Sequence, residues 1–424
     1  MKPRRGIAGN GFVSHLEREY MISVQKAEEL LALYPPAVFT QTVSLEDSLH
    51  KVLAQSISSK RDQPPFHRVA MDGIALRFDD YKKGIRSFKV ANLQKAGEPQ
   101  KTLDAEGACI EVMTGAVLPK NTDCVVRYED IEIIDGYAQL NIEVDFMQNI
   151  HQKGSDHQQG TEVLPAGVKM TSPRIGIAAS NGYSQVQIYA MPKIAIVSTG
   201  DELVDLQETP QDHQIYRSNS FSLQAELNSF GFKDIQSFHI EDNKESLLEK
   251  LSFILNEYGV VILSGGVSMG KFDFLPQILS DLKTKEIFHK ISQRPGKPFW
   301  YGVGEKGQGV YALPGNPVSC LVCLRRYVVP ALYKAMGSRL DVERGSQSEG
   351  VLAKDFTFEK NLTYFLPVKA SKNHENIIEL LPCPTNGSGD YGALGESDGF
   401  IELPLEKTFF KKGESYKYFP WGHI

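Results

Sequence analysis

The chain lacks the features of a membrane or secreted protein. None of its apolar runs approaches the roughly 18–20 residues of a membrane-spanning helix. The first twenty residues carry Lys2, Arg4 and Arg5 without the apolar stretch of a signal peptide. Cysteine is sparse and odd in number, at 5, which argues against a disulfide framework and for reduced thiols. We therefore expect a cytoplasmic protein that makes no contact with a membrane.

A basic excess is missing as well. The net charge of −6 and the sequence pI of about 6.0 argue against a nucleic-acid-binding protein. An anionic ligand would therefore need a local basic cluster. The 10 histidines show no HExxH or other metal-ligand spacing. Cys320 and Cys323 have no second thiol pair, so we expect them to pack in a core, with a zinc or redox role as the alternative.

The predicted secondary structure changes twice in the first part of the chain. Apolar residues at helical spacing predict helices over 23–33 and over 44–54, the second with Ser44 as its N-cap. After Arg61, short β-rich runs alternate with turn residues at intervals of roughly ten, which is typical of a small all-β unit. Its centre lies at about 87–145, and it interrupts a segment that resumes near Ile150.

A strand and helix alternation follows the boundary at 191–193. Apolar runs predict strands at 194–197, 260–263 and 310–313, and helical spacing predicts helices over 220–230 and 244–257. This alternation indicates a doubly wound α/β domain. From about residue 343 onward, short strands without helices suggest a small β-barrel or sandwich. The fold class is therefore multidomain, α/β plus all-β. We predict domains at 20–60 with 150–190, at 61–149, at 191–338 and at 343–424.

Three loops of the α/β region carry the signature of a ligand site. Ser264-Gly-Gly-Val-Ser-Met-Gly270 follows a buried strand, and Gly265 and Gly266 can take positive φ and let backbone N–H groups approach a ligand. Ser198-Thr-Gly-Asp-Glu202 and Pro314-Gly-Asn-Pro317 follow two other strands. In an open parallel sheet all three loops would meet at the carboxyl edge, where ligands bind. The alternative for any one loop is a tight turn that merely ends a strand.

Charged residues lie close to these loops in sequence. Lys290, Arg294 and Lys297 surround the turn Pro295-Gly296, and they could hold an anion or form a solvated charge run. Glu202 and Asp273 are carboxylates beside the glycine-rich loops. Such carboxylates usually hold Mg²⁺, although a loop aspartate can also be a simple turn former.

Seven short motifs occur in one order along the chain. They are Met71-Asp-Gly73, Met113-Thr-Gly-Ala116, Gly154-Ser-Asp156, Ser198-Thr-Gly-Asp-Glu-Leu203, Ser264-Gly-Gly-Val-Ser268, Pro295-Gly-Lys-Pro298 and Leu313-Pro-Gly-Asn-Pro-Val-Ser319. Together they resemble the molybdopterin molybdenumtransferase family (MoeA, and the E domain of gephyrin), over roughly residues 23–401.

The resemblance implies an elongated homodimer with a segmented N-terminal linker domain, an inserted β domain, a doubly wound MogA-like α/β domain and a C-terminal β-barrel. It implies that adenylated molybdopterin and molybdate are converted, with Mg²⁺ as the cofactor, into molybdenum cofactor and AMP. Transient contact with molybdopterin adenylyltransferase and with cofactor-accepting apoenzymes would follow. The alternatives are a pterin adenylyltransferase and a gephyrin-like scaffold without catalysis.

The motif matches also imply site residues. The catalytic set comprises Asp72, Thr114, Asp156, Glu202, Asp273, Lys290 and Arg294, of which Glu202 and Asp273 would hold the metal. The substrate-binding set comprises Thr199, Gly200, Ser264, Gly265, Gly266, Ser268, Lys297, Pro314, Gly315, Asn316 and Ser319. Three positions depart from the family's pattern. Arg217 stands where an aspartate is common, Arg294 where close relatives have lysine, and Leu362-Thr363 where an arginine is common.

Overall fold

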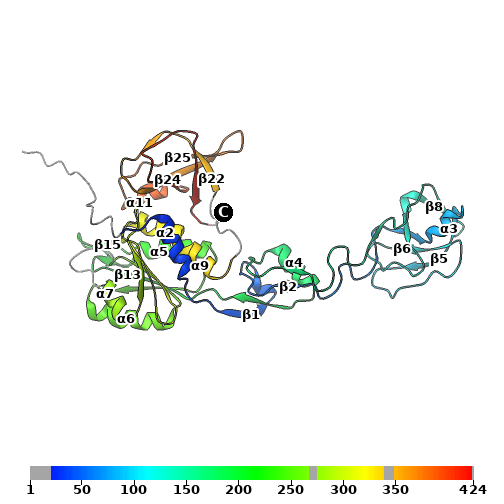
Figure 1. Ribbon diagram of the computed structural model, residues 1–424, viewed down its shortest axis with the longest axis horizontal. Helices are drawn as coiled ribbons and strands as arrows, with labels where there is room; N and C mark the ends of the chain where they lie inside the picture. The colour runs from blue at the N-terminus through cyan, green and yellow to red at the C-terminus, as the bar shows by residue number, and fades with distance from the viewer. Residues whose placement is uncertain (1–20, 267–274, 339–347, 423–424) are drawn as a thin grey trace, which may run out of the picture.

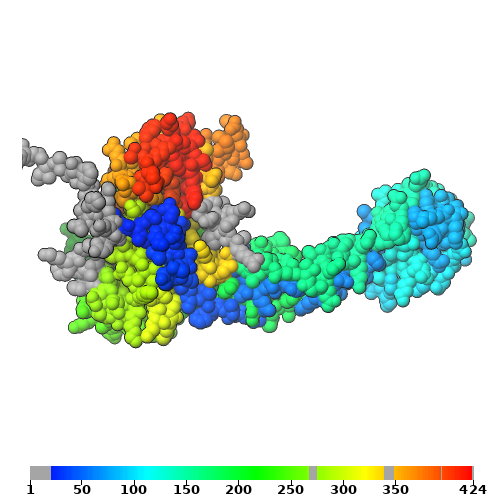
Figure 2. Space-filling view, in the orientation of Figure 1, coloured from blue at the N-terminus to red at the C-terminus, as the bar shows by residue number. Residues whose placement is uncertain are grey.

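The computed structural model describes residues 21–266, 275–338 and 348–422. The chain forms a body and a long arm (Figures 1 and 2). The body contains the α/β sheet and the C-terminal strands, and the arm ends in a separate sheet at its far tip. Within the described residues, no helix is both long and apolar enough to span a membrane.

The body is built on a six-stranded sheet with the order β16-β13-β17-β21-β20-β18. Its strands are β13 (Ile194–Thr199), β16 (Ile235–Ile240), β17 (Val260–Ser264), β18 (Lys285–His289), β20 (Trp300–Val303) and β21 (Gly309–Leu313). The first four strands in the spatial order are parallel, whereas β20 and β18 are antiparallel to their neighbours. The chain runs outward from β13 to β16 and then returns to β17 on the other side of β13. This reversal creates the switch point at which open α/β sheets bind ligands.

Helices cover both faces of this sheet, which confirms the doubly wound prediction. One face carries α2 (Val24–Leu33), α5 (Asn219–Ser229), α8 (Pro317–Cys323), the π-helical turn η3 (Leu324–Val328) and α9 (Val329–Ala335). The other face carries α6 (Lys244–Glu257) and α7 (Leu275–Asp281). In β13, Ile194 and Ile196 enter the first core, and Ala195 and Val197 enter the second. Burial on both faces explains why the strands read as unbroken apolar runs.

The C-terminal strands close into a five-stranded barrel. Its order is β24-β25-β22-β28-β26, and a β24–β26 pairing completes the ring. The barrel region contains β22 (Ser348–Leu352), β23 (Phe356–Thr357), β24 (Thr363–Lys372), β25 (Ile378–Pro382), α11 (Tyr391–Gly395), β26 (Gly399–Leu403), β27 (Phe409–Phe410) and β28 (Ser415–Pro420). β19 (Gln293–Arg294), from the α/β region, pairs with β24 and joins the barrel to the body. The predicted barrel is confirmed, but the expectation of strands without helices was wrong at α11.

The arm is made of two chain segments that run out and back together. Three antiparallel pairs follow one another along it: β1 (Thr40–Ser44) with β12 (Gln185–Tyr189), β2 (Ile57–Ser58) with β11 (Glu162–Leu164), and β3 (Arg68–Val69) with β10 (Ile150–His151). The arm also carries η1 (Glu46–Ser48) and α4 (Ser172–Ser180). Because the chain leaves along one strand of each pair and returns along the other, the β unit at the tip is an insertion, as predicted.

The tip is a six-stranded sheet of order β7-β4-β6-β5-β9-β8. It consists of β4 (Gly73–Leu76), β5 (Ser87–Gln94), β6 (Ala108–Val112), β7 (Cys124–Arg127), β8 (Ile131–Ile134) and β9 (Tyr137–Leu140), with α3 (Phe78–Lys82) and η2 (Tyr128–Asp130). The sheet begins earlier than the predicted centre of the unit at 87–145. The domain limits given above stay predictions.

The helix predicted over 44–54 was wrong. Apart from the short turn η1, this segment is not helical, and His50 takes a left-handed φ of 66°. Val52 and Leu53 instead form isolated β-bridges with the returning half of the arm, and each enters a different hydrophobic core. The apolar residues whose spacing predicted a helix are therefore buried by an extended segment, which packs against two different cores.

Candidate active site

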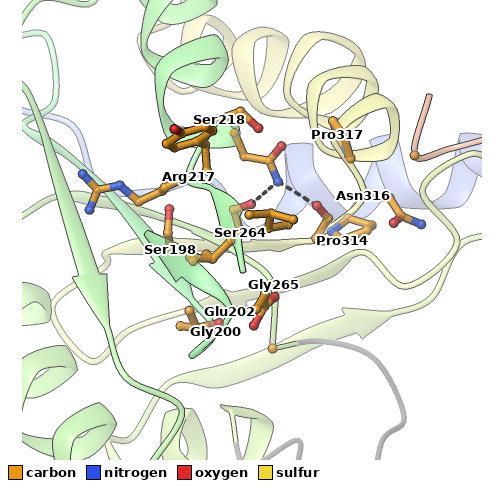
Figure 3. A pocket seen from close by; sticks show the side chains of 18 of the residues that line it. Ser198, Gly200, Glu202, Arg217, Ser218, Ser264, Gly265, Pro314, Asn316 and Pro317 are labelled. Carbon is orange, nitrogen blue, oxygen red and sulfur yellow. Dashed lines mark hydrogen bonds between the residues drawn. The ribbon is translucent and has the colours of Figure 1, made fainter. Parts of the chain in front are cut away.

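The three loops predicted to converge do meet at the carboxyl end of the parallel strands. They line a cavity of about 1070 Å³ over the switch point between β13 and β17 (Figure 3). A cavity of this size can hold a nucleotide-sized ligand. Among the predicted site residues, the lining includes Thr199, Gly200, Glu202, Ser264, Gly265, Gly266, Pro314, Gly315 and Asn316.

Glycine is required where the first two loops touch. A Cβ on Gly265 would lie 2.9 Å from the backbone oxygen of Thr199, and the φ of Gly265 is 101°. A Cβ on Gly200 would lie 2.5 Å from a carboxylate oxygen of Glu202, so this glycine lets that carboxylate fold back against the loop. The glycines therefore bring polar backbone and one carboxylate to the same wall of the cavity.

Two buried serines stand at the ends of neighbouring strands. Ser198 and Ser264 are paired in register on β13 and β17, and both line the cavity. The Oγ of Ser198 is buried and has no hydrogen-bond partner among the described residues. The side-chain nitrogen of Asn219 donates to Ser264 Oγ at 2.9 Å and to the backbone oxygen of Gly315 at 2.7 Å (Figure 3). A buried hydroxyl without a partner is a feature that a polar ligand would satisfy.

Three carboxylates gather on one side of the cavity. Glu202 and Asp242 line it, and the backbone N–H of Asp242 donates to Asp201 Oδ1 at 3.0 Å. Burial, followed by the negative charges of Asp201 and Glu202, raises the pKa of Asp242. In the part of the chain that the structure describes, no three His, Cys, Asp or Glu side chains form a group that could hold a metal ion by themselves.

Arg217 is the only cationic side chain among the described residues that line the cavity. It precedes α5, and one of its terminal nitrogens contacts Asp205 Oδ1 at 2.6 Å. Its side chain is 15% exposed, and its Nε is buried without a partner among the described residues. Figure 3 shows Arg217 on the side of Ser264 opposite Asn316. The departure from the family's pattern thus puts a positive charge into the cavity wall.

The predicted basic cluster lies outside the lining of this cavity. Lys290, Arg294 and Lys297 are half-buried in the connection between β18 and β20, and only the following Pro298 reaches the lining. Lys290 has a left-handed φ of 73°, a conformation that costs a non-glycine residue energy and is frequent at functional sites. Ser319 is buried in α8 and does not line the cavity either. Ser268 and Asp273 lie outside the described residues.

The other predicted catalytic residues are on the arm, far from the cavity (Figure 1). Asp72 accepts two hydrogen bonds from Thr114, one from the backbone N–H at 2.5 Å and one from Oγ1 at 2.7 Å. These bonds, the backbone one first, lower the pKa of Asp72. Within one chain, the structure therefore brings Asp72 and Thr114 together but leaves both at the other end of the molecule from Glu202.

Asp156 is held by a short chain of polar contacts on the arm. Arg68 Nη2 lies 2.8 Å from His151 Nδ1, and His151 Nε2 lies 2.8 Å from Asp156 Oδ1. Arginine can only donate, so Nδ1 accepts and the ring proton is on Nε2, which donates to Asp156. Asp156 thus has a fixed orientation although its side chain is 50% exposed.

Several cavity residues escaped the motif-based prediction. Ser198, Asn219 and Asp242 line the cavity beside predicted residues, and Tyr391 reaches it from the barrel region. Ser198 begins a quoted motif, and its place at the end of a buried strand was a usable signal. Tyr391 gave no signal, because it is 172 residues from Asn219, to which it is hydrogen-bonded. Cys320 and Cys323 are buried free thiols, in agreement with the prediction of core packing.

Sequence comparisons match nearly the whole chain. The MoeA N-terminal region (domain I and II) matches residues 22–182, a probable molybdopterin binding domain matches 195–334, and the MoeA C-terminal region (domain IV) matches 349–421. The molybdopterin molybdenumtransferase of Synechocystis is 39% identical over 407 residues, which is 95% of this chain and 100% of that protein. The molybdopterin molybdenumtransferase of Staphylococcus epidermidis is 30% identical over 406 residues, with 94% and 95% coverage.

Structural comparison agrees with this assignment. The crystal structure of the molybdopterin biosynthesis MoeA protein from Pyrococcus horikoshii superposes with a TM-score of 0.80 at 28% identity, covering 95% of this chain and 100% of that one. The same architecture, including the inserted unit and the barrel, is therefore present in both. The chain belongs to the molybdopterin molybdenumtransferase (MoeA) family.

Proposed function

We propose that the protein inserts molybdenum from molybdate into adenylated molybdopterin, with release of AMP and formation of molybdenum cofactor. The observation that carries this proposal is the cavity at the switch point, where three loops of the probable molybdopterin binding domain converge. The 39% identity to a molybdopterin molybdenumtransferase across the whole chain supports the same reaction.

The cavity suits a ligand with phosphate groups and a ring system. Ser198 and Ser264 offer hydroxyl donors, and Arg217 offers positive charge. Charge-assisted bonds of this kind contribute about 1.5–3 kcal/mol each in proteins. Tyr216 and Tyr391 add aromatic surface to the lining. Adenylated molybdopterin combines these requirements, because it carries phosphates between two heterocycles.

Mg²⁺ is proposed as the cofactor, and the residues present fit it. Mg²⁺ prefers oxygen ligands and usually takes one or two carboxylates together with substrate phosphates and water. Glu202 and Asp242 supply such carboxylates, and their mutual repulsion, which contributes to the raised pKa of Asp242, would be relieved by a cation. Asp273 remains the second predicted ligand beside Glu202. When bound, Mg²⁺ would neutralise phosphate charge as the bond to AMP breaks.

Lys290, Arg294 and Lys297 are proposed to hold molybdate, the second substrate. Molybdate is an oxyanion and needs positive charge close to the phosphates that repel it. The half-buried connection between β18 and β20 carries these three cations, and Pro298, directly after Lys297, lines the cavity. The left-handed backbone of Lys290 supports a functional reason for its placement.

We further propose that a homodimer completes the site. Asp72, Thr114 and Asp156 cannot meet Glu202 within one chain, since the arm carries them away from the body (Figure 1). A second copy could supply them, because a two-fold axis places the same surfaces of two chains against each other twice. We also propose that the protein works in the cytoplasm, where it would contact the adenylyltransferase and cofactor-accepting apoenzymes. Its five buried free cysteines support a reducing compartment.

Mixing two inactive variants tests the reaction and the dimer together. Glu202→Ala removes a carboxylate of the cavity, and Asp72→Ala removes one on the arm. Each variant alone should release AMP from adenylated molybdopterin, molybdate and Mg²⁺ at least about 100-fold more slowly than the unmodified protein. After subunit exchange, half of the dimers would be hybrids with one intact site, so about a quarter of the activity should return.

The outcomes separate the parts of the proposal. No AMP release by the unmodified protein would contradict the reaction, and ATP consumption with unadenylated pterin would indicate an adenylyltransferase instead. Inactive variants that stay inactive after exchange would contradict a site shared between copies. Glu208→Ala, which removes an exposed carboxylate near the cavity but outside its lining, is the matched control and should leave the rate unchanged.

A further inference from the structure

The C-terminal barrel region supplies side chains to the cavity of the α/β region. Tyr391, the first residue of α11, lines the cavity, and its hydroxyl donates to Asn219 Oδ1 at 3.1 Å. Ser388, in the same loop, accepts at 2.9 Å from the side-chain nitrogen of Asn316 and, through its backbone oxygen, at 3.2 Å from the N–H of Val318. The barrel loop is therefore bonded to two walls of the cavity.

Both the nitrogen and the oxygen of the Asn219 side-chain amide have hydrogen-bond partners. Its nitrogen has two hydrogens, which go to Ser264 Oγ and to the backbone oxygen of Gly315 (Figure 3). Its oxygen accepts from Tyr391. An amide bonded in this way has only one orientation, because a flip would set its oxygen against the Gly315 oxygen.

These bonds leave the hydroxyl proton of Ser264 as the group that can bond to a further partner. Its Oγ accepts from Asn219, and the buried thiol of Cys320 lies 3.6 Å from the same oxygen. Burial raises the pKa of Cys320 to about 12, so this thiol keeps its proton and can donate. With both lone pairs of Oγ engaged, the hydroxyl proton of Ser264 is free to donate, and none of the described residues accepts it. Ser264 is 3% exposed and lines the cavity, so its hydroxyl is placed to donate to a ligand bound there.

We propose that Tyr391 is a positioning residue that acts through Asn219 to present the Ser264 hydroxyl as a hydrogen-bond donor to a phosphate of the bound ligand. The inference rests on the proposed function, and it adds a contribution of the barrel region to phosphate recognition. Tyr391 donates to Asn219, Asn219 donates to Ser264, and Ser264 donates to the phosphate. Because the bonds point in one direction, each polarises the next, and the last bond to an anion gains most.

Binding measurements with AMP and adenosine test this arrangement, because only AMP carries the phosphate. Tyr391→Phe keeps the ring and removes the hydroxyl, and it should weaken AMP binding about 3- to 10-fold, the range of one lost hydrogen bond. Adenosine binding should not change. Ser222→Ala is the matched control, because it removes the other contact of the Tyr391 hydroxyl, at 3.3 Å, and leaves the bond to Asn219. This control should bind AMP like the unmodified protein.

A double-mutant cycle separates positioning from a merely structural role. Ser264→Ala alone should weaken AMP binding about 10-fold or more, and adding Tyr391→Phe to it should change the affinity by less than about twofold. Independent effects of the two substitutions, or equal losses for AMP and adenosine, would overturn the inference while the proposed function stands. If Tyr391→Phe lowers the melting temperature, Asn219→Ala takes its place in the same cycle. An unmodified protein that neither binds AMP nor releases it would overturn the proposed function and this inference together.

Discussion

The cavity of the body and the polar residues of the arm differ in how they are held. In the cavity, Ser264 is 3% exposed, and its hydroxyl is held by Asn219 and Cys320, which come from two distant parts of the chain. On the arm, Asp156 is 50% exposed, and its side chain contacts His151, five residues away in sequence. Asp72 is likewise exposed and is bonded to Thr114 of the same tip region.

This difference indicates two kinds of contribution to one reaction. Polar groups that are buried and already oriented interact strongly with a ligand, because no water has to be reorganised when it binds. Exposed carboxylates remain solvated and gain strength only when another surface covers them. The cavity is thus organised to recognise a ligand by itself, whereas the arm residues suit a role that begins once a second copy is in place.

The largest effect is expected from a methyl group placed between the loops of the cavity. Gly265→Ala sets a Cβ 2.9 Å from the Thr199 backbone oxygen at a φ of 101°, so the loops must separate. We expect AMP release to fall more than about 50-fold, since a displacement of about 1 Å at such a site can cost 100-fold. The steady-state rate with adenylated molybdopterin and molybdate measures this effect.

Gly136→Ala provides the matched control at the tip of the arm. Gly136 has a φ of 80°, but an added Cβ would meet nothing within 4 Å. It should lower the free energy of unfolding by about 1–2 kcal/mol through backbone strain, with the rate unchanged. Equal losses of activity in the two variants would contradict the view that the cavity alone depends on close packing of its loops.

The sequence was sufficient to predict the loops of the cavity but not their partners. The Ser198–Glu202, Ser264–Gly270 and Pro314–Pro317 loops could be placed together because the carboxyl ends of parallel strands share one edge of a sheet. The contact between Asn219 and Tyr391 could not be predicted, since it depends on how the barrel packs against the α/β region. Pairing across 172 residues leaves no local pattern.

For the arm, the residues could be predicted from the sequence, but their position in the molecule could not. Motif matches selected Asp72, Thr114 and Asp156, but nothing in the local sequence indicated that an extended double strand would carry them away from Glu202. The error over 44–54 has the same origin. Leu45, Leu49, Val52 and Leu53 are spaced as on one face of a helix. Val52 and Leu53 nevertheless enter two different cores from an extended chain. Long-range contacts overrode the local periodicity.

A smaller effect is expected from removing the charge in the cavity wall. Arg217→Gln should weaken AMP binding about 3- to 10-fold at low salt, and less at 1 M salt, where the Debye length falls to about 3 Å. Titration calorimetry at two salt concentrations measures the loss of AMP affinity and its dependence on salt. Lys250→Gln removes an exposed charge of α6 in the same region and should have no effect. If both substitutions act equally, the loss reflects overall charge, and the distinction between an organised cavity and a solvated surface weakens.

The smallest effect is expected on the arm, where Thr114→Val removes one of the two hydrogen bonds to Asp72. The backbone N–H bond, the larger cause of the lowered pKa of Asp72, remains. The pKa of Asp72 should rise toward its usual value without reaching it. Asp72 then takes up its proton at a higher pH, so activity lost on acidification is lost earlier. Carbon-13 NMR of the carboxyl group and the pH dependence of AMP release measure the two shifts.

The sign of the stability change follows from the same pKa. Because the folded-state pKa of Asp72 is lowered, its contribution to stability is present above the unfolded-state pKa and is lost as the pH falls through the folded-state pKa. Thr114→Val reduces that contribution in the acid range, and Thr114→Ser, which keeps the hydroxyl, should not. A shift as large in Thr114→Ser as in Thr114→Val would mean that the side-chain bond does not hold Asp72. The ionised carboxylate would then depend on the backbone of the tip alone, as an exposed group with local partners can.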